Sequence, residues 1–161
     1  MISNNLRLDK SGRSEALFFK DKKNIFSKKL VRYLEDHYKK NKHEIRFCIH
    51  ENKKTNLQVM INLILKKTRY QLHYHNFSDE YYIPLKGNLK LLTFNKKKKF
   101  DNSFILNKDN SFLGKIYKGQ THIAIPLNRY CVYLEFRSGN FTQHKNTFLN
   151  KYLSYKKAVK L

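Results

Sequence analysis

The spacing of apolar residues changes near residue 42. Between residues 24 and 41 apolar side chains recur at every fourth position, with charged side chains between them: Phe26, Leu30, Leu34 and Tyr38. This spacing predicts one amphipathic helix, with Asn24 or Ser27 as its N-cap. Residues 1–14 are polar and are expected to be irregular, and residues 16–19 are expected to form a short strand.

After residue 42 apolar and polar residues alternate in short segments that are separated by turn residues. A period of two is typical of β-strands, and many short, evenly spaced strands indicate a sandwich or barrel. The predicted strands are residues 44–50, 57–66, 69–75, 80–86, 88–95, 102–107, 112–117, 121–126 and 130–136. A final basic helix is expected over residues 146–159. The predicted fold class is therefore all-β, with one N-terminal amphipathic helix and a short C-terminal helix.

A chain of 161 residues is long enough for one hydrophobic core. We therefore expect a single domain, in which residues 1–43 form a strand and the helix, 44–142 a β-barrel and 143–161 a basic tail. No apolar stretch approaches the roughly 20 residues of a membrane-spanning helix, and no signal peptide is apparent. The two cysteines, Cys48 and Cys131, are then expected to be reduced thiols of a cytoplasmic protein.

The chain is strongly basic, with 34 Lys and Arg against 12 Asp and Glu and a net charge of +22. Such a charge is typical of proteins that bind polyanions, because cations displace counterions from a phosphate backbone. Here the excess is mainly lysine and is spread along the chain, and its densest run, residues 96–99, falls at an expected hairpin tip. No zinc-finger, helix-turn-helix or RRM-like motif accompanies it. A nucleic-acid partner is therefore disfavoured.

The candidate chemistry lies in a histidine-rich segment. His73 and His75 occupy alternate positions of an expected strand, so their side chains share one face. Residues 76–79 are turn formers that return the chain, so that Glu80 can open the next strand on the same interior face. Gly87 falls where the following hairpin reverses, and glycine accepts a positive φ there. Two imidazoles and a carboxylate arranged in this way typically hold Fe(II), Mn(II) or Zn(II).

The spacing His-x-His-x4-Glu-x6-Gly resembles the first motif of the cupin superfamily, whose fold is a double-stranded jelly-roll β-barrel. The second cupin motif supplies one more histidine after further strands, and Gly119 and His122 stand in that place here. The resemblance implies that His122 joins His73, His75 and Glu80 as the fourth ligand of one divalent transition metal ion. Fe, Mn, Zn and Ni all remain open as the metal.

Further segments are similar to the WbuC-type cupin metalloproteins. They are residues 14–18, 46–50, 92–95 and 134–141, so the likeness covers about residues 14–142. Members of that family are often associated with genes for surface-polysaccharide synthesis, which implies a role in carbohydrate metabolism. The chain departs from the family pattern at Lys67, residues 71–72, Tyr117 and Pro126. These departures bear on the substrate, because all four ligand positions are kept.

Alternation along the two motif strands predicts which residues line the pocket. If His73 and Glu80 face inward, so do Gln71 and Tyr82. The other candidate pocket residues are Glu135, Arg46 and His50. The opposite faces are apolar, and they form one patch if the two strands pair as a hairpin: Tyr70, Leu72, Tyr74, Tyr81, Ile83 and Leu85. Something must cover such a patch, and we expect a homodimer.

A six-coordinate metal with four protein ligands keeps two open positions, at which it can chelate adjacent oxygens of a sugar and act as a Lewis acid. The first hypothesis is accordingly a metal-dependent isomerase or epimerase that acts on a carbohydrate or nucleotide sugar, with no catalytic residue assigned. The alternatives are an Fe(II)-dependent dioxygenase, a non-catalytic metal-containing sugar-binding module and, last, a basic nucleic-acid binder.

Overall fold

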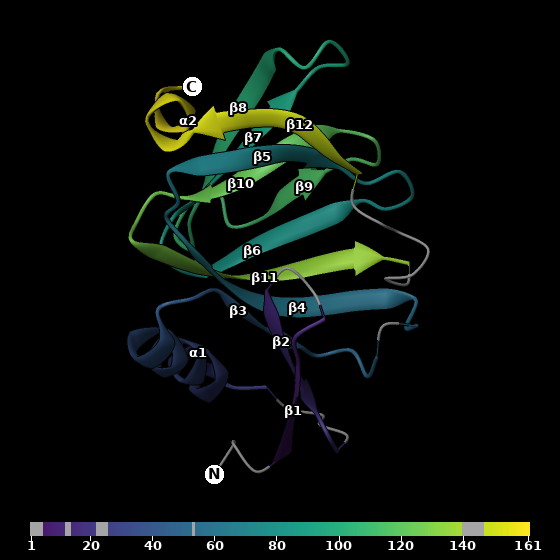
Figure 1. The fold of residues 1–161 in the computed structure, drawn as a ribbon, viewed down its shortest axis with the longest axis vertical. Coiled ribbons are helices and arrows are strands. Elements are labelled where there is room, and N and C mark those ends of the chain that lie inside the picture. Colours follow the sequence, from purple (N-terminus) through teal and green to yellow (C-terminus); the bar gives the residue numbers. More distant parts are fainter. Residues whose placement is uncertain (1–4, 12–13, 22–25, 53, 140–146) are drawn as a thin grey trace.

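The computed structural model describes residues 5–11, 14–21, 26–52, 54–139 and 147–161. Its strands form two facing sheets of a jelly-roll barrel (Figure 1). In spatial order, the larger sheet contains β1 (Leu6–Asp9), β2 (Glu15–Phe19), β3 (Ile45–Cys48), β4 (Leu57–Leu65), β11 (Tyr130–Ser138), β6 (Glu80–Lys86) and β9 (Gly114–Ile116). The smaller sheet contains β12 (Thr147–Ser154), β5 (Arg69–Tyr74), β10 (Thr121–Pro126), β7 (Leu89–Phe94) and β8 (Phe100–Leu106). Strands β2 and β3 pair in parallel, and the other described pairs are antiparallel.

The strands predicted between residues 44 and 136 are all present, with ends shifted by a few residues. Two strands were not predicted, β1 near the N-terminus and β12 near the C-terminus. The helix predicted over residues 146–159 is wrong in its first half, because these residues form β12 and only α2 (Tyr155–Lys160) is helical. Strand β12 pairs with β5 and so covers what would be an open sheet edge. That pairing outweighs the helical spacing of its apolar residues.

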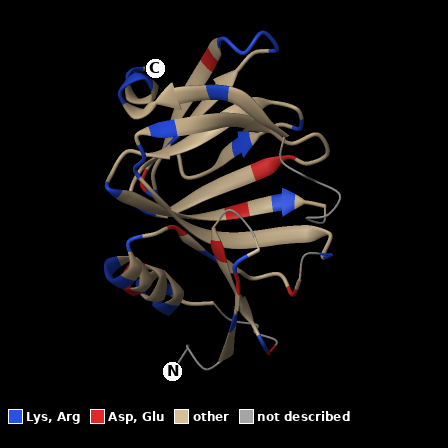
Figure 2. Ribbon diagram, in the orientation of Figure 1, with Lys and Arg blue, Asp and Glu red and all other residues tan. Residues whose placement is uncertain are grey.

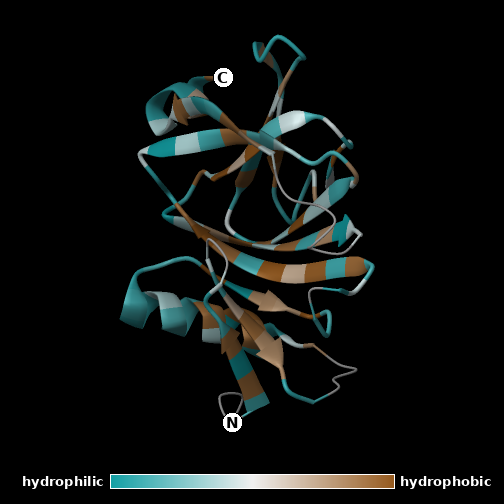
Figure 3. Cartoon of the chain, turned by 45° about the vertical axis from the view of Figure 1, so that its right-hand side comes forward, coloured by the Kyte–Doolittle hydropathy of each residue, from teal (hydrophilic) through white to brown (hydrophobic). Residues whose placement is uncertain are grey.

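Helix α1 (Lys28–Asn41) lies on the outer face of the larger sheet (Figure 1). The predicted apolar positions Leu30, Leu34 and Tyr38 are buried in one cluster with residues of β2, β3, β4 and β11. Ser27 is the N-cap, and its hydroxyl accepts a hydrogen bond from the Lys29 amide. Asn24, the other predicted cap, lies outside the described residues. Apolar residues are concentrated on the strands beside the helix (Figure 3).

Helix α2 covers part of the outer face of the smaller sheet. Ala158 is fully buried there, in one cluster with Tyr70 and Leu72 of β5. The predicted apolar patch is therefore wrong on two counts. Its β5 half is covered by the chain's own C-terminal segment, and β5 and β6 do not pair because they belong to different sheets.

Positive charge is distributed over both sheets, both helices and several turns (Figure 2). The lysine run at residues 96–99 forms the turn between β7 and β8, as its position between two apolar residues predicted. Neither α1 nor α2 has the length and the apolar content that a membrane-spanning helix requires.

Candidate metal centre

The four predicted ligands come together where the two sheets meet. His73 on β5 lies directly opposite His122 on β10, and His75 follows the end of β5. Glu80 is the first residue of β6 and approaches from the larger sheet. One ligand atom from each of the four residues lies within 4.8 Å of those of the others. The barrel fold thus brings four residues that are distant in sequence into one cluster.

Two turns that carry the motifs are joined by backbone hydrogen bonds. The Gly119 amide donates to the His75 carbonyl oxygen at 2.7 Å, and the Lys118 amide donates to Asp79 Oδ1 at 2.8 Å. Gly119 has a φ of +76°, which favours glycine. These contacts fix the loop that leads into β10 against the loop that follows β5. They thereby set the position of His122 relative to the first motif.

The carboxylate of Glu80 lies at the centre of the cluster. Its Oε1 is 2.8 Å from His75 Nε2, and its Oε2 is 3.0 Å from His122 Nε2. The ring centroids of His73 and His122 are 4.3 Å apart. His75, Glu80 and His122 are each at most 2% exposed. Three imidazoles and one carboxylate therefore share a site from which bulk water is largely excluded.

The protonation states of His73 and Glu80 suit metal binding. Burial and the charge of His122 lower the pKa of His73 well below its ordinary value, which leaves that imidazole neutral. Burial acts to raise the pKa of Glu80, but its close contacts with His122 and His75 hold it well below its ordinary range. Neutral imidazoles and an ionised carboxylate are the forms that bind metal ions.

Two of the ring nitrogens also have the orientation that a metal site requires. His122 Nδ1 is 2.9 Å from the Gln120 carbonyl oxygen, and a proton donated there leaves the Nε2 lone pair facing the cluster. His75 Nε2 is buried close to Glu80 but makes no hydrogen bond of acceptable geometry within the described part of the chain. A divalent cation between these atoms would satisfy both nitrogens. The residues present therefore fit such an ion.

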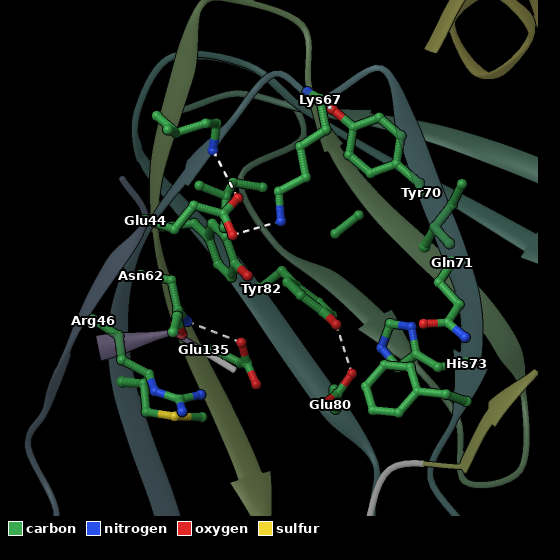
Figure 4. A pocket seen from close by; sticks show the side chains of 18 of the residues that line it. Glu44, Arg46, Asn62, Lys67, Tyr70, Gln71, His73, Glu80, Tyr82 and Glu135 are labelled. Atoms are coloured by element: carbon green, nitrogen blue, oxygen red, sulfur yellow. Dashed lines mark hydrogen bonds and ion pairs between the residues drawn. The ribbon is translucent and has the colours of Figure 1, made fainter. Parts of the chain in front are cut away.

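A polar cavity of about 310 Å³ opens beside this cluster (Figure 4). His73 and Glu80 line it, and so do four of the five predicted pocket residues, Gln71, Tyr82, Glu135 and Arg46. His50, the fifth, does not line the cavity. Its Nδ1 lies 3.0 Å from the Val59 carbonyl oxygen and its ring packs edge-on against Phe18. The prediction failed because His50 follows the end of β3, where strand alternation no longer applies.

Two of these residues hold protons at the cavity wall. The Tyr82 hydroxyl donates to Glu80 Oε2 at 2.5 Å, and burial together with the Glu80 charge raises the pKa of Tyr82 well above its ordinary value. Burial and the Glu80 charge raise the pKa of Glu135 to about 7, against the opposing effect of Arg137 and Arg46. Glu135 is thus a buried carboxyl group that can exchange a proton near neutral pH.

Sequence reasoning missed Asn62, which lines the cavity and donates to Glu135 Oε2 at 2.9 Å (Figure 4). A signal was present, because Gln58 and Asn62 interrupt the apolar run of β4 at positions that share one face. Lys67 and Arg69 also line the cavity, together with Glu44, which forms an ion pair with Lys67 at 2.6 Å. The cavity is therefore bordered by cations as well as by the candidate ligands.

Comparison with solved structures shows the same fold at low sequence identity. A structure of CapF with an inhibitor matches 61% of this chain at a TM-score of 0.53 and 19% identity, over 30% of its own length. The Staphylococcus aureus capsular polysaccharide assembling protein CapF matches 57% of this chain at a TM-score of 0.50 and 18% identity, over 26% of its length. These likenesses show the cupin-type jelly roll expected from the sequence.

The chain spans about a quarter to a third of the length of these solved structures. No curated protein matches the chain. A family model described as a domain of unknown function, DUF6016, matches residues 25–106, about half of the sequence and including the first motif. On this match, the chain belongs to the DUF6016 family.

Proposed function

We propose that this chain is a metal-dependent cupin that acts on a carbohydrate or nucleotide sugar, by isomerase or epimerase chemistry. The observation that carries the proposal is the convergence of four buried ligand atoms beside a polar cavity. His73, His75, Glu80 and His122 would hold one divalent transition metal ion. When bound, that ion would supply Lewis-acid polarisation of a substrate oxygen.

The residues around the cluster support proton-transfer chemistry. By proton transfer, isomerisation moves a proton from one carbon to its neighbour, and epimerisation removes a proton from a carbon and returns one to the opposite face of the same carbon. Glu135 has a pKa of about 7 and faces the cavity, so it can accept and return a proton at neutral pH. Tyr82 keeps its proton and holds Glu80 in place through its hydroxyl. In this proposal Glu135 is the acid–base residue and Tyr82 is a positioning residue.

The lining of the cavity supports a sugar or nucleotide sugar as the substrate. Gln71 and Asn62 offer hydrogen bonds to hydroxyl groups, and Lys67 and Arg69 offer positive charge to a phosphate or carboxylate. The cavity volume of about 310 Å³ is at the lower end for ligand pockets, which suits a single sugar ring with any nucleotide outside. The WbuC-type resemblance and the role of CapF in capsular polysaccharide assembly agree with this substrate class.

We also propose that the chain forms a homodimer through the outer face of β6. Tyr81 and Ile83 are half-buried on that strand, and Leu85 is 37% exposed. Nothing from the described C-terminal segment clusters with these residues, in contrast to Tyr70 and Leu72 of β5. A two-fold contact would cover the same apolar surface on both copies.

Incubation of the metal-loaded protein with a panel of nucleoside diphosphate sugars in D₂O tests the reaction class. An isomerase or epimerase should incorporate deuterium at a sugar carbon, which NMR detects, and Glu135→Gln should reduce the rate by at least a hundredfold. Glu51→Gln, at an exposed position, is the matched control. Binding without exchange would identify a non-catalytic sugar-binding module. Substrate-dependent oxygen uptake with Fe(II) would identify a dioxygenase, and either outcome would overturn the proposed reaction.

A further inference from the structure

A second cluster of metal-ligating side chains lies outside the metal centre, between α1 and the N-terminal strands. It consists of Glu15 at the start of β2, His37 in α1 and His43 in the connection to β3. The parallel pairing of β2 with β3 places Glu15 beside Ile45, two residues after His43. Three elements therefore bring these side chains together. None of them takes part in the site described above.

The three ligand atoms make one compact triangle. His43 Nε2 is 2.7 Å from Glu15 Oε2, His37 Nε2 is 3.1 Å from His43 Nε2, and His37 Nε2 is 3.6 Å from Glu15 Oε2. In a tetrahedral zinc site with metal–ligand distances of about 2.05 Å, neighbouring ligand atoms are about 3.3 Å apart. The observed separations scatter around that value. The triangle thus has the size of one face of a zinc coordination sphere.

The other atoms of these side chains are engaged in a way that leaves the triangle free for a cation. His43 Nδ1 lies 3.3 Å from the Asn41 carbonyl oxygen, and a proton donated there leaves the Nε2 lone pair on the triangle. Glu15 Oε1 pairs with Lys10 Nζ at 3.2 Å, so Oε2 is the oxygen that faces both imidazoles. His43 Nε2 and Glu15 Oε2 then present lone pairs to the triangle, at which a cation would also lie within reach of His37 Nε2.

Hydrogen bonds within the triangle do not satisfy its three ligand atoms as well as a bound divalent ion would. A protonated His43 could donate from Nε2 to Glu15, but the same hydrogen would not serve His37 Nε2 at 3.1 Å. One divalent ion would contact all three ligand atoms at once.

The site is also accessible from solvent. The side chains of Glu15 and His37 are about one-fifth exposed, and that of His43 is 42% exposed. A cavity of about 420 Å³ borders Glu15 and His43, and four of its lining residues also line the polar cavity described above: Ser14, Glu44, Leu65 and Lys67. A fourth coordination position could therefore hold water or a ligand oxygen at the mouth of the main cavity.

We propose that Glu15, His37 and His43 form a second metal site, which binds Zn(II) with one open coordination position. The bound ion bridges α1, β2 and the segment before β3. It therefore holds the helix against the N-terminal edge of the larger sheet. The site is independent of the metal centre at His73, His75, Glu80 and His122, and of the reaction proposed there.

The test is zinc binding to the full chain. After equilibration with Zn(II) and removal of loosely bound ion by gel filtration, elemental analysis should give two zinc ions per wild-type chain. The variant His37→Gln/His43→Gln should retain one, and His73→Ala/His75→Ala should lose the other ion. Asp36→Asn removes an exposed carboxylate next to His37 and should retain two. If the centre at His73, His75, Glu80 and His122 binds no zinc, the wild type should carry one ion that only His37→Gln/His43→Gln removes.

Glu15→Gln tests the second metal site independently if His37→Gln/His43→Gln folds poorly. Glu15→Gln preserves side-chain volume and should weaken zinc affinity at this site at least tenfold in a chelator competition. With chelator present, its melting temperature should remain close to that of the wild type. Zinc should raise the melting temperature of the wild type more than that of Glu15→Gln. Zinc content and affinity unchanged in both variants would overturn the second site.

Discussion

His73 and His122 lie directly opposite each other on antiparallel strands, and their ring centroids are 4.3 Å apart. Two imidazoles so close and so deeply buried cannot both carry charge without a large penalty. Their register is fixed by the pairing of β5 with β10, which brings together residues 49 positions apart in sequence. The barrel itself therefore keeps the His73 imidazole neutral beside the Glu80 carboxylate.

Tyr82→Phe should weaken metal affinity about tenfold or more, because it removes the hydroxyl that donates to Glu80 Oε2. Chelator competition measures the change. Tyr81→Phe alters a hydroxyl on the opposite face of the same strand and should leave the affinity unchanged. Equal affinities for the Tyr82 variant and the wild type would show that this hydrogen bond does not orient the carboxylate.

Glu135→Gln should change how stability depends on pH. The pKa of Glu135 is about 7 in the folded protein and near 4.5 when unfolded, so between these values the folded state binds the extra proton. This group therefore lowers the free energy of unfolding as pH rises from about 4.5 to 7, by on the order of 3 kcal/mol in total. Chemical denaturation of the metal-free protein should show the Gln variant gaining stability relative to the wild type across that window.

Glu51→Gln is the control for the pH experiment, because residue 51 is exposed and does not line the cavity. Its stability profile should follow the wild type at every pH. A Glu135→Gln profile parallel to that of the wild type would contradict the raised pKa.

Ala158→Asp should destabilise the protein by several kcal/mol, because it places a carboxylate in the fully buried contact between α2 and β5. Val159→Asp adds the same charge at the next position, where the side chain is 38% exposed, and should change stability by less than about 1 kcal/mol. Denaturant unfolding of both variants gives the comparison. Similar values for the two would mean that α2 does not pack on the smaller sheet.

Sedimentation at micromolar concentration should give about twice the chain mass of 19.5 kDa if the outer face of β6 forms a dimer. Ile83→Asp should shift the protein towards a monomer, because it would bury a charge in that contact. Ser103→Asp, on the smaller sheet, is a control that should remain dimeric. A monomeric wild type would contradict the dimer and leave the metal centre unaffected.

The spacing of apolar residues predicted much of this fold, because it indicates which side of each helix or strand is buried. The period of four fixed the buried face of α1, and alternation placed the strands from β3 to β11. The motif spacing also identified three of the four clustered residues, His73, His75 and Glu80, since side chains at alternate strand positions share a face. Their convergence with His122 required the family resemblance, because no local rule relates residue 122 to residue 73.

Pairing between distant segments could not be predicted in the same way. Strand β12 is stabilised by its contact with β5, about 78 residues away, so its own helical spacing was misleading. Likewise β5 and β6 follow each other in sequence and yet belong to different sheets. The triangle of Glu15, His37 and His43 depends on the packing of α1 beside the parallel pair β2–β3. No local spacing rule relates Glu15 to His37 and His43, so the sequence did not indicate this triangle.

The central claim is that His73, His75, Glu80 and His122 hold one metal ion. The metal content of variants that lack His73 and His75 tests this claim most directly. In a chain that carries His37→Gln/His43→Gln, purified protein should contain one transition metal ion. Adding His73→Ala/His75→Ala should reduce this to none, whereas adding His50→Gln, at a buried histidine outside the cavity lining, should leave it at one. Metal bound equally tightly without His73 and His75 would contradict the assignment of this centre.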